Sequence, residues 1–212
     1  MPDSTSLKSL RLQLRKARRS LPDGQRLQNE LRIANQLLHL PEIRRCRRLA
    51  LYQSEDGEVD LRLLGLALVS DGIQLCLPVL RPGRENRLWF APYHPGDRMH
   101  RNRFDIAEPD TRRFPPLALR SLDLVLMPLV GFDERLNRIG MGGGFYDRTF
   151  AFRRNSRWRR PLLIGIAHEC QKVSGLDQRH WDVPMDAVVT ELGVYRASGK
   201  TEKNKQNSEN RL

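Results

Sequence analysis

The sequence predicts an α/β protein of three layers, in which a mainly parallel sheet carries helices on both faces. Short apolar segments of strand type alternate with segments of helical spacing, an order typical of parallel sheets. The strand candidate at 122–127 is almost wholly apolar, as expected for a strand buried on both faces. With 212 residues and 39% apolar composition, the chain fits one such domain.

Two helices are expected before the first strand. The first is amphipathic and is ended by Pro22. Its apolar positions are Leu7, Leu10, Leu14, Ala17 and Leu21. The second is expected to begin at an Asp23 cap and to end near Pro41. Its predicted apolar stripe consists of Leu27, Leu31, Ala34 and Leu38.

Strands and helices alternate along the rest of the chain. Strands are predicted at 48–52, 73–78, 88–93, 122–127, 162–167 and 187–190, and helices at 60–70 and 143–152. Ligands of such sheets bind in loops that follow the carboxyl ends of strands. Residues 198–212 are polar and rich in lysine and asparagine, so a disordered tail is expected after a domain of residues 1–197.

Composition and charge narrow the class of protein. No segment is apolar over the roughly 20 residues that a bilayer span needs, and the first 21 residues lack the apolar core of a signal peptide. The three cysteines are far apart, which indicates neither a disulfide framework nor a zinc site. A cytoplasmic protein without a membrane partner is expected. Its net charge of +12 attracts polyanions, including nucleotides, folates and RNA.

The most informative segment is 128–148, which reads PLVGFDERLNRIGMGGGFYDR. It follows an apolar strand, contains Gly140, Gly142, Gly143 and Gly144, and leads into a predicted helix. Glycines let backbone N–H groups approach a phosphate closely. The segment lacks the ending of a Walker loop and the spacing of a dinucleotide fingerprint. From these residues alone, a tight structural turn and a phosphate-binding loop both stay open.

The whole segment resembles the signature of the 5-formyltetrahydrofolate cyclo-ligase family (5,10-methenyltetrahydrofolate synthetases) in its bacterial form. The shared features are Phe132-Asp133, Arg138 with glycines at alternate positions, and the string Phe145-Tyr146-Asp147-Arg148. Further matches follow in the same order at the basic first helix, 57–60, 77–79, 102–109 and 182–186. The resemblance covers about residues 6–196 and implies a single-domain fold of the NagB/RpiA/CoA-transferase-like type.

The resemblance implies a reaction in which ATP and 5-formyltetrahydrofolate give 5,10-methenyltetrahydrofolate, ADP and phosphate, with Mg²⁺ as cofactor. The formyl oxygen is a poor leaving group, so it is phosphorylated before N10 closes the ring. Phosphoryl transfer depends on holding the γ-phosphoryl group in line while cations and backbone donors neutralise developing charge. The partners are then small molecules, and a monomer is expected.

The resemblance also implies roles for individual residues. Arg138 and Tyr146 are expected to be catalytic. The residues expected to bind ATP are Lys8, Arg11, Arg138, Ile139, Gly140, Met141, Gly142, Gly143, Gly144, Phe145 and Tyr146. Those expected to bind the folate are Gln53, Glu58, Phe104, Met141, Gly142, Gly143, Gly144 and Phe145. Asp147 and Asp182 are expected to bind Mg²⁺, which takes one or two carboxylates plus phosphate oxygens and waters.

Several of these residues also have a plainer interpretation. Lys8 and Arg11 fit a solvated helix face, and Asp147 fits an acid favoured by the helix dipole. Asp182 fits a turn. Phe104 fits core packing as well as stacking on a folate.

The sequence departs from the family pattern at two points that bear on the phosphates. Gly143 stands where some members have a lysine, so another cation must supply that charge. Lys8 and Arg11 are three residues apart where four is common in the family, so Arg15 competes with Arg11 for the same role.

Two other functions were weighed. In the run 153–160 the aromatic Trp158 lies among arginines, a composition found in proteins that bind single-stranded RNA. However, no RRM, KH or zinc module is recognisable. Nucleic acid is therefore not expected as the main partner. A sugar-phosphate isomerase on the same general fold is a further alternative, and it would not consume ATP.

Overall fold

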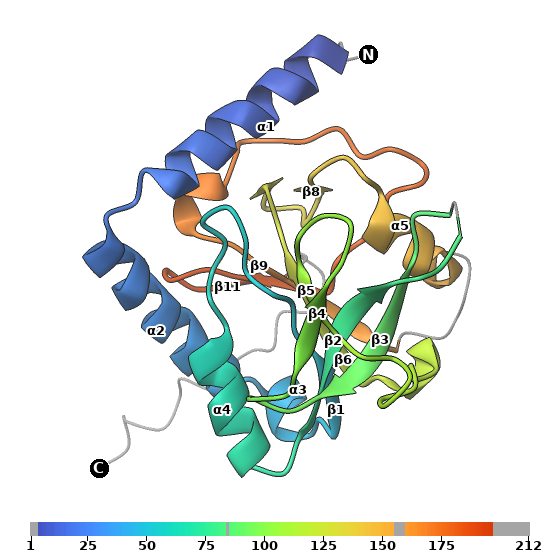
Figure 1. Cartoon of the computed structure of the whole chain (residues 1–212). Helices are drawn as coiled ribbons and strands as arrows, with labels where there is room; N and C mark the ends of the chain where they lie inside the picture. The colour runs from blue at the N-terminus through green and yellow to red at the C-terminus, as the bar shows by residue number, and fades with distance from the viewer. Residues whose placement is uncertain (1–3, 84, 155–159, 197–212) are drawn as a thin grey trace, which may run out of the picture.

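A seven-stranded sheet lies at the centre of the molecule (Figure 1), in the order β11-β10-β9-β6-β1-β2-β3. This computed structural model describes residues 4–83, 85–154 and 160–196. The sheet contains β1 (Arg48–Ala50), β2 (Gln74–Leu80), β3 (Leu88–Tyr93), β6 (Leu124–Pro128), β9 (Leu162–Ile166), β10 (Ala187–Val189) and β11 (Val194–Arg196). Neighbours from β2 to β10 are parallel, and antiparallel β3 and β11 form the edges. The prediction of a mainly parallel sheet is confirmed.

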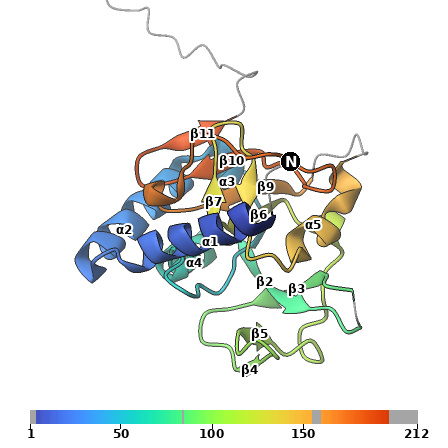
Figure 2. The same ribbon diagram turned by 90° about the horizontal axis from the view of Figure 1, so that it is seen from above.

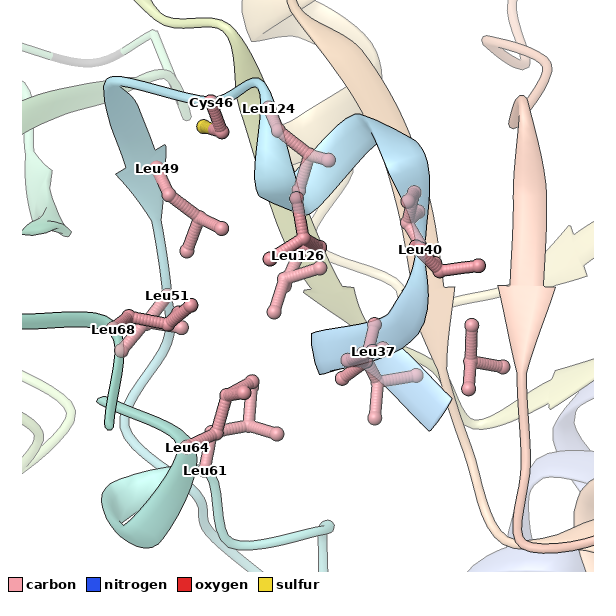
Figure 3. Close-up of a cluster of buried hydrophobic side chains, with 14 of the residues drawn as sticks. Leu37, Leu40, Cys46, Leu49, Leu51, Leu61, Leu64, Leu68, Leu124 and Leu126 are labelled. Atoms are coloured by element: carbon pink, nitrogen blue, oxygen red, sulfur yellow. The ribbon is translucent and has the colours of Figure 1, made fainter. Parts of the chain in front are cut away.

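Helices cover both faces of the sheet. One face packs on α2 (Asp23–His39), α3 (Pro41–Arg44) and α4 (Arg62–Ser70), and Figure 3 shows leucines of α2, α4, β1 and β6 meeting there. The other face packs on α5 (Phe145–Thr149) and the 3-10 turn η2 (Ala151–Arg153). Side chains alternate along each strand, so Leu124 and Leu126 join the first cluster while Val125 and Met127 join the second. The three-layer prediction is therefore confirmed as well.

The strand order reverses beside β1. From β1 the sheet grows through β2 on one side and through β6, β9 and β10 on the other. Ligands of parallel sheets bind above the carboxyl ends of strands at such a reversal. The loops that follow β1 and β6 lie there, and α1 (Ser4–Arg19) runs across the same end of the sheet in both views (Figures 1 and 2).

Two hairpins were not predicted. They pair β4 (Met99–Arg101) with β5 (Ala107–Pro109), and β7 (Gly131–Phe132) with β8 (Arg138–Ile139). The 3-10 turns η1 (Leu119–Ser121) and η3 (Glu169–Gln171) complete the described elements. Strands of two or three residues are too short for a hydrophobic period to emerge. The buried Glu108 ties the β4–β5 hairpin to β2 by accepting the N–H of Leu80, 2.9 Å away.

The apolar stripe predicted for α2 is confirmed only in part, because Ala34 and Leu38 pack against the core but Leu27 and Leu31 do not. The residues that face the core are Asn29, Ile33 and Leu37, whereas Leu27 and Leu31 are half exposed. Apolar side chains occupy more of this helix than one stripe needs, so packing on the sheet, and not the pattern itself, selects the buried face.

Two helix boundaries also differ from expectation. Asp23 is the first helical residue and makes no side-chain capping bond, because Pro22 occupies the cap position. The helix predicted at 143–152 is shorter and interrupted. Gly144 has the left-handed φ of 65°, so α5 begins only at Phe145, and η2 follows after Phe150.

Some expectations fall on segments outside the described residues. These are the disordered tail at 198–212 and the centre of the arginine run at 155–159, including Trp158. Within the described chain, every helix is too short or too polar to traverse a bilayer. The three cysteines are free thiols, with Cys46 and Cys76 buried and Cys170 exposed.

Candidate active site

The glycine loop, residues 140–144, connects β8 to α5. Gly142 has a φ of 99° and Gly144 a φ of 65°, a region in which other residues are strained. The carbonyl oxygen of Gly143 accepts hydrogen bonds from Asn86 Nδ2 at 3.1 Å and from Arg148 at 2.6 Å. Met141, at the tip, is 55% exposed. The base of the loop is thus held in place, while its tip faces solvent.

Arg138 and Asp147 form an ion pair across the ends of this loop. Arg138 Nη2 lies 2.6 Å from Asp147 Oδ1, and the arginine side chain is only 8% exposed. Arg138 Nη1 also donates to the carbonyl oxygen of Val183, whose N–H donates to Asp147 Oδ1. These bonds join the glycine loop to the segment before β10, which contains Asp182.

The two predicted metal ligands are linked through Val183, whose N–H donates to Asp147 and which directly follows Asp182 in the chain. Asp182 Oδ2 accepts the N–H of Arg179 at 2.9 Å, so this residue does close a turn. Among the described residues, no donor bonds to Asp147 Oδ2 or Asp182 Oδ1, and no group of three metal-ligating side chains occurs. Two carboxylates with free oxygens fit Mg²⁺, which completes its shell with phosphates and water.

Helix α1 reaches the glycine loop through Arg11. Arg11 Nε donates to the carbonyl oxygen of Gly140 at 3.0 Å, whereas Arg15 Nε binds Asp56 Oδ2 at 2.7 Å. Lys8 lies one turn before Arg11 on the exposed surface of α1. Of the two competing arginines, Arg11 is therefore the one beside the loop.

Glu58 lies in the loop that follows β1. Its side chain is 10% exposed, and its Oε2 accepts the N–H of Glu55 at 3.2 Å. Burial raises the pKa of Glu58 to about 7, and the positive charge of Arg18 opposes that rise. Glu58 therefore changes its charge near neutral pH, as groups in active sites often do. Gln53 lies in the same loop, three residues beyond β1, and is partly buried.

Tyr146 connects the glycine loop to Glu58. Burial raises the pKa of Tyr146, the negative charge of Glu58 raises it further, and Arg138 lowers it. Burial likewise raises the pKa of Tyr52, with smaller contributions from Glu58 and Tyr146. Such contributions fall off with distance, so these side chains lie in one neighbourhood. The structure thus brings the loop and Glu58 together.

Phe104 approaches the loop from the β4–β5 hairpin. Its ring packs edge-on against Phe145, with centroids 5.8 Å apart and an angle of 89°. The ring is 52% exposed, so the core-packing interpretation of Phe104 is wrong. The guanidinium of Arg103 lies 5.0 Å from the centroid of the Phe104 ring. An exposed aromatic surface therefore borders the loop.

Arg18 and Asp56 are residues of this region that sequence reasoning missed. Arg18 is fully buried, and its guanidinium donates to both the side chain and the carbonyl oxygen of Asp56. The available signal was spacing, because Arg18 follows Arg11 by seven residues and Leu14 by four, which places all three on one helix face.

The basic run 153–160 is anchored at both ends. Arg153 is buried and donates two hydrogen bonds of 2.9 Å to the carboxylate of Asp186. Arg160 Nη1 lies 2.7 Å from Asp123 Oδ1. Both arginines balance acids of the fold, and the buried Arg153 is thereby removed from the cationic surface that an RNA site would need.

Comparisons with known proteins identify the family of the chain. A model of the 5-formyltetrahydrofolate cyclo-ligase family matches residues 3–191. The chain is 39% identical over 176 residues to the 5-formyltetrahydrofolate cyclo-ligase of Haemophilus influenzae, covering 83% of this chain and 92% of the relative. It is 37% identical over 182 residues to the 5-formyltetrahydrofolate cyclo-ligase of Escherichia coli K12, and the match covers 86% of this chain and 98% of the relative.

Solved structures of similar fold include two 5,10-methenyltetrahydrofolate synthetases. That of Aquifex aeolicus matches with a TM-score of 0.78 and 27% identity, over 96% of this chain and 98% of the other. The structure from Mycoplasma pneumoniae is 22% identical and supports the fold, with a TM-score of 0.69. The match covers 87% of this chain and 98% of the other. Because the family model and both bacterial relatives match most of its length, this chain belongs to the 5-formyltetrahydrofolate cyclo-ligase family of enzymes.

Proposed function

We propose that this enzyme uses ATP and Mg²⁺ to convert 5-formyltetrahydrofolate to 5,10-methenyltetrahydrofolate. One observation carries the proposal: helix α1 contacts the glycine loop through Arg11 and the loop of the largely buried Glu58 through Arg18, where the strand order reverses. A phosphate-binding element and an acceptor for a pterin are thereby adjacent. Family membership supplies the chemical identity of the two substrates.

ATP would bind along the glycine loop. The backbone N–H groups of a glycine-rich turn suit phosphate oxygens, and cations around it add attraction. Arg138, Arg11 and Lys8 are the cations proposed to meet the phosphates. The other residues proposed to contact ATP are Ile139, Gly140, Met141, Gly142, Gly143, Gly144, Phe145 and Tyr146. Arg138, Arg11 and Arg148 all donate hydrogen bonds to the loop or its ends, and each is a candidate to replace the family's lysine.

Asp147 and Asp182 would hold the magnesium ion through their free oxygens. A bound ion supplies positive charge that neutralises phosphate oxygens. Before the substrates bind, Arg138 balances the charge of Asp147, which keeps the carboxylate in place at the first turn of α5.

The folate would bind between Glu58 and the tip of the glycine loop. The Glu58 carboxylate is an acceptor for the N–H donors of the pterin, and Gln53 extends the same edge. Phe104 offers a face for stacking, and residues 141–145 of the loop would close over the formyl group. Tyr146 and Arg138, between Glu58 and the phosphates, would act at the reacting centre.

The reaction would proceed in two steps. The formyl oxygen attacks the γ-phosphorus and ADP leaves, with Arg138 and the loop N–H groups stabilising the transferring phosphoryl group. N10 then attacks the activated formyl carbon, and phosphate leaves as the ring closes. We further propose that the protein acts in the cytoplasm as a monomer.

The direct test combines the purified protein with ATP, Mg²⁺ and 5-formyltetrahydrofolate. The expected result is the absorbance of the methenyl product together with one ADP per product formed. Reactions without ATP and reactions with an unformylated tetrahydrofolate serve as controls. Absence of methenyl product, or product formed without ADP, would refute the proposal. The alternative function, a sugar-phosphate isomerase, predicts that no ATP is consumed in this assay.

A further inference from the structure

We propose that Arg18 is the positioning residue of the folate site, because its buried guanidinium holds the Glu58 loop against the loop that follows β6. The inference rests on the proposed function in one respect, namely that Glu58 is the acceptor for the pterin. Arg18 contacts the loops of two different strands and is not among the residues proposed to touch either substrate.

The contacts of Arg18 use every nitrogen of its guanidinium. Nε donates to the carbonyl oxygen of Asp56 at 2.8 Å, and Nη2 donates to Asp56 Oδ2 at 2.9 Å. Nη1 donates to the carbonyl oxygen of Leu129 at 3.0 Å, just after β6. Nη2 also lies 3.6 Å from Glu58 Oε1. One side chain therefore joins the loops that follow β1 and β6, the two strands at the reversal of the sheet.

The turn to which Arg18 bonds has an unfavourable backbone conformation. Asp56 has a positive φ of 54°, and Gly57 has a φ of 77°. A non-glycine residue in this region persists only where surrounding contacts fix it. Glu58 follows directly, so the bonds between Arg18 and Asp56 determine where the Glu58 carboxylate points.

Arg18 also sets the charge balance around Glu58. The acidic neighbours are Asp56 and Glu55 of the same loop, and the tyrosines Tyr52 and Tyr146 come from the ends of β1 and α5. The positive charges that act on these acids from α1 are Arg18 and, further out, Arg15 and Arg19. Arg18 is the one of these cations that is fully buried, so water screens its charge least.

The far side of Arg18 supports this assignment. His168 is fully buried, and burial together with the charges of Arg26 and Arg18 lowers its pKa to about 4. A neutral imidazole leaves the arginine charge uncompensated on that side. Arg18 is therefore balanced by the acids of the Glu58 loop.

Helix α1 extends the arrangement to the phosphate side. Arg11, Leu14 and Arg18 share one helix face, and about 10 Å along the axis separates Arg11 from Arg18. Between them, Leu14 packs with Val130 and Ile139. The same rigid helix thus meets the glycine loop near its middle and the Glu58 loop near its C-terminal end.

The test compares Arg18→Met and Arg18→Lys with Arg19→Met. Arg19 pairs with the same Asp56 carboxylate from the surface, at 3.2 Å and 47% exposed, so it is a matched control. For each variant, KM for 5-formyltetrahydrofolate, KM for ATP and kcat are measured from pH 5.5 to 9, with urea unfolding as a check of folding.

For Arg18→Met we expect the KM for the folate to rise at least about tenfold, with a much smaller change in the KM for ATP. The acid-side midpoint of the folate KM profile should shift upward, because the ionised Glu58 loses its buried positive neighbour. Arg18→Lys keeps the positive charge but loses the planar guanidinium and its several donors. The pH midpoint of the folate KM should therefore stay near that of the wild type, while the folate KM itself should rise less than in Arg18→Met. Arg19→Met should change neither.

A folded Arg18→Met protein with the folate KM and pH midpoint of the wild type would overturn the inference. If Arg18→Met does not fold, Arg18→Lys decides, because an unaltered folate KM in that variant would equally overturn it. A wild-type protein without turnover would instead refute the proposed function, and the dependence on Glu58 would fall with it.

Discussion

The Nε atom of Arg11 donates a hydrogen bond to the carbonyl oxygen of Gly140, 3.0 Å away, so the first helix touches the glycine loop at a defined point. Arg15, one turn later, is directed to Asp56 instead. This difference separates two arginines that the spacing of the sequence could not distinguish.

Replacing Arg11 with methionine is expected to weaken ATP binding. Loss of a charged donor beside the phosphates corresponds to about 1.5 kcal/mol, so the KM for ATP should rise about tenfold in steady-state assays. Arg15→Met is the matched variant, and its KM for ATP should stay within about twofold of the wild type. The reverse pattern, with ATP binding weakened only in Arg15→Met, would contradict the assigned register.

Replacing Asp147 with asparagine is expected to lower kcat by about 100-fold or more at a fixed Mg²⁺ concentration, because a charged ligand of the ion is lost. The amide oxygen still accepts the bonds from Arg138 and the Val183 N–H, so the variant should fold. Raising the Mg²⁺ concentration should recover part of the activity.

Asp23→Asn is the control for this experiment, because its side chain is fully exposed at the start of α2. Turnover in that variant should match the wild type. An Asp147→Asn protein with ordinary Mg²⁺ dependence would exclude Asp147 as a ligand of the ion.

The stability of the protein should fall between pH 4.5 and pH 7 through Glu58. Its pKa is about 7 in the folded chain and 4.5 as an ordinary glutamate, so the folded state binds the proton more tightly over this window. Stability decreases with rising pH wherever the folded state binds more protons. The loss above pH 7 is about 3 kcal/mol relative to pH 4.

Glu58→Gln removes this titration. Urea unfolding should show the variant about as stable as the wild type at pH 4 and more stable by roughly 1–3 kcal/mol at pH 8. At pH 8 the same variant should bind the folate more weakly, since the charged acceptor is gone. A stability difference that stays constant from pH 4 to pH 8 would show that Glu58 does not titrate in this range.

Gly143→Ala tests how tightly the loop packs on its aromatic neighbour. A Cβ at Gly143 would lie 2.8 Å from Cε2 of Phe145, so this ring, which packs against Phe104, must shift. We expect the KM for the folate to rise several-fold, and Gly143→Lys to do the same in spite of its extra charge.

Gly175→Ala is the matched glycine substitution, because no atom lies within 4 Å of its added Cβ. Its kinetics should be unchanged. A Gly143→Ala enzyme with normal folate KM would mean that Phe145 does not need its observed position.

Six of the seven strands of the sheet were predictable because each is a local apolar run, whereas β11, at 194–196, was not predicted. Residues 88–93 and 187–189 lie almost where the pattern predicts them, and the parallel order follows from the intervening helices. The glycine loop was also recognisable, because its residues are contiguous. Its shape was less so, since the left-handed Gly144 delays the start of α5.

The parts that could not be predicted depend on contacts between distant segments. The apolar pattern favours Leu27 over Asn29 as an inward residue of α2, and only packing in the fold reverses that choice. Arg18 reads as one more surface cation in a basic helix, and only the fold brings it to Asp56 and Leu129. A sequence pattern records neighbours along the chain, whereas a buried ion pair is defined by neighbours in space.

The anchoring of α1 has a consequence for how the enzyme assembles. The bond from Arg11 to Gly140 joins positions 129 apart, and that from Arg18 to Leu129 joins positions 111 apart. Contacts of such long range form late, because a large loop must close first. During synthesis α1 leaves the ribosome well before residues 129 and 140, so it can dock only after they have been made. We expect the sheet to form before the active site is complete. Refolding should therefore regain secondary structure before enzymatic activity.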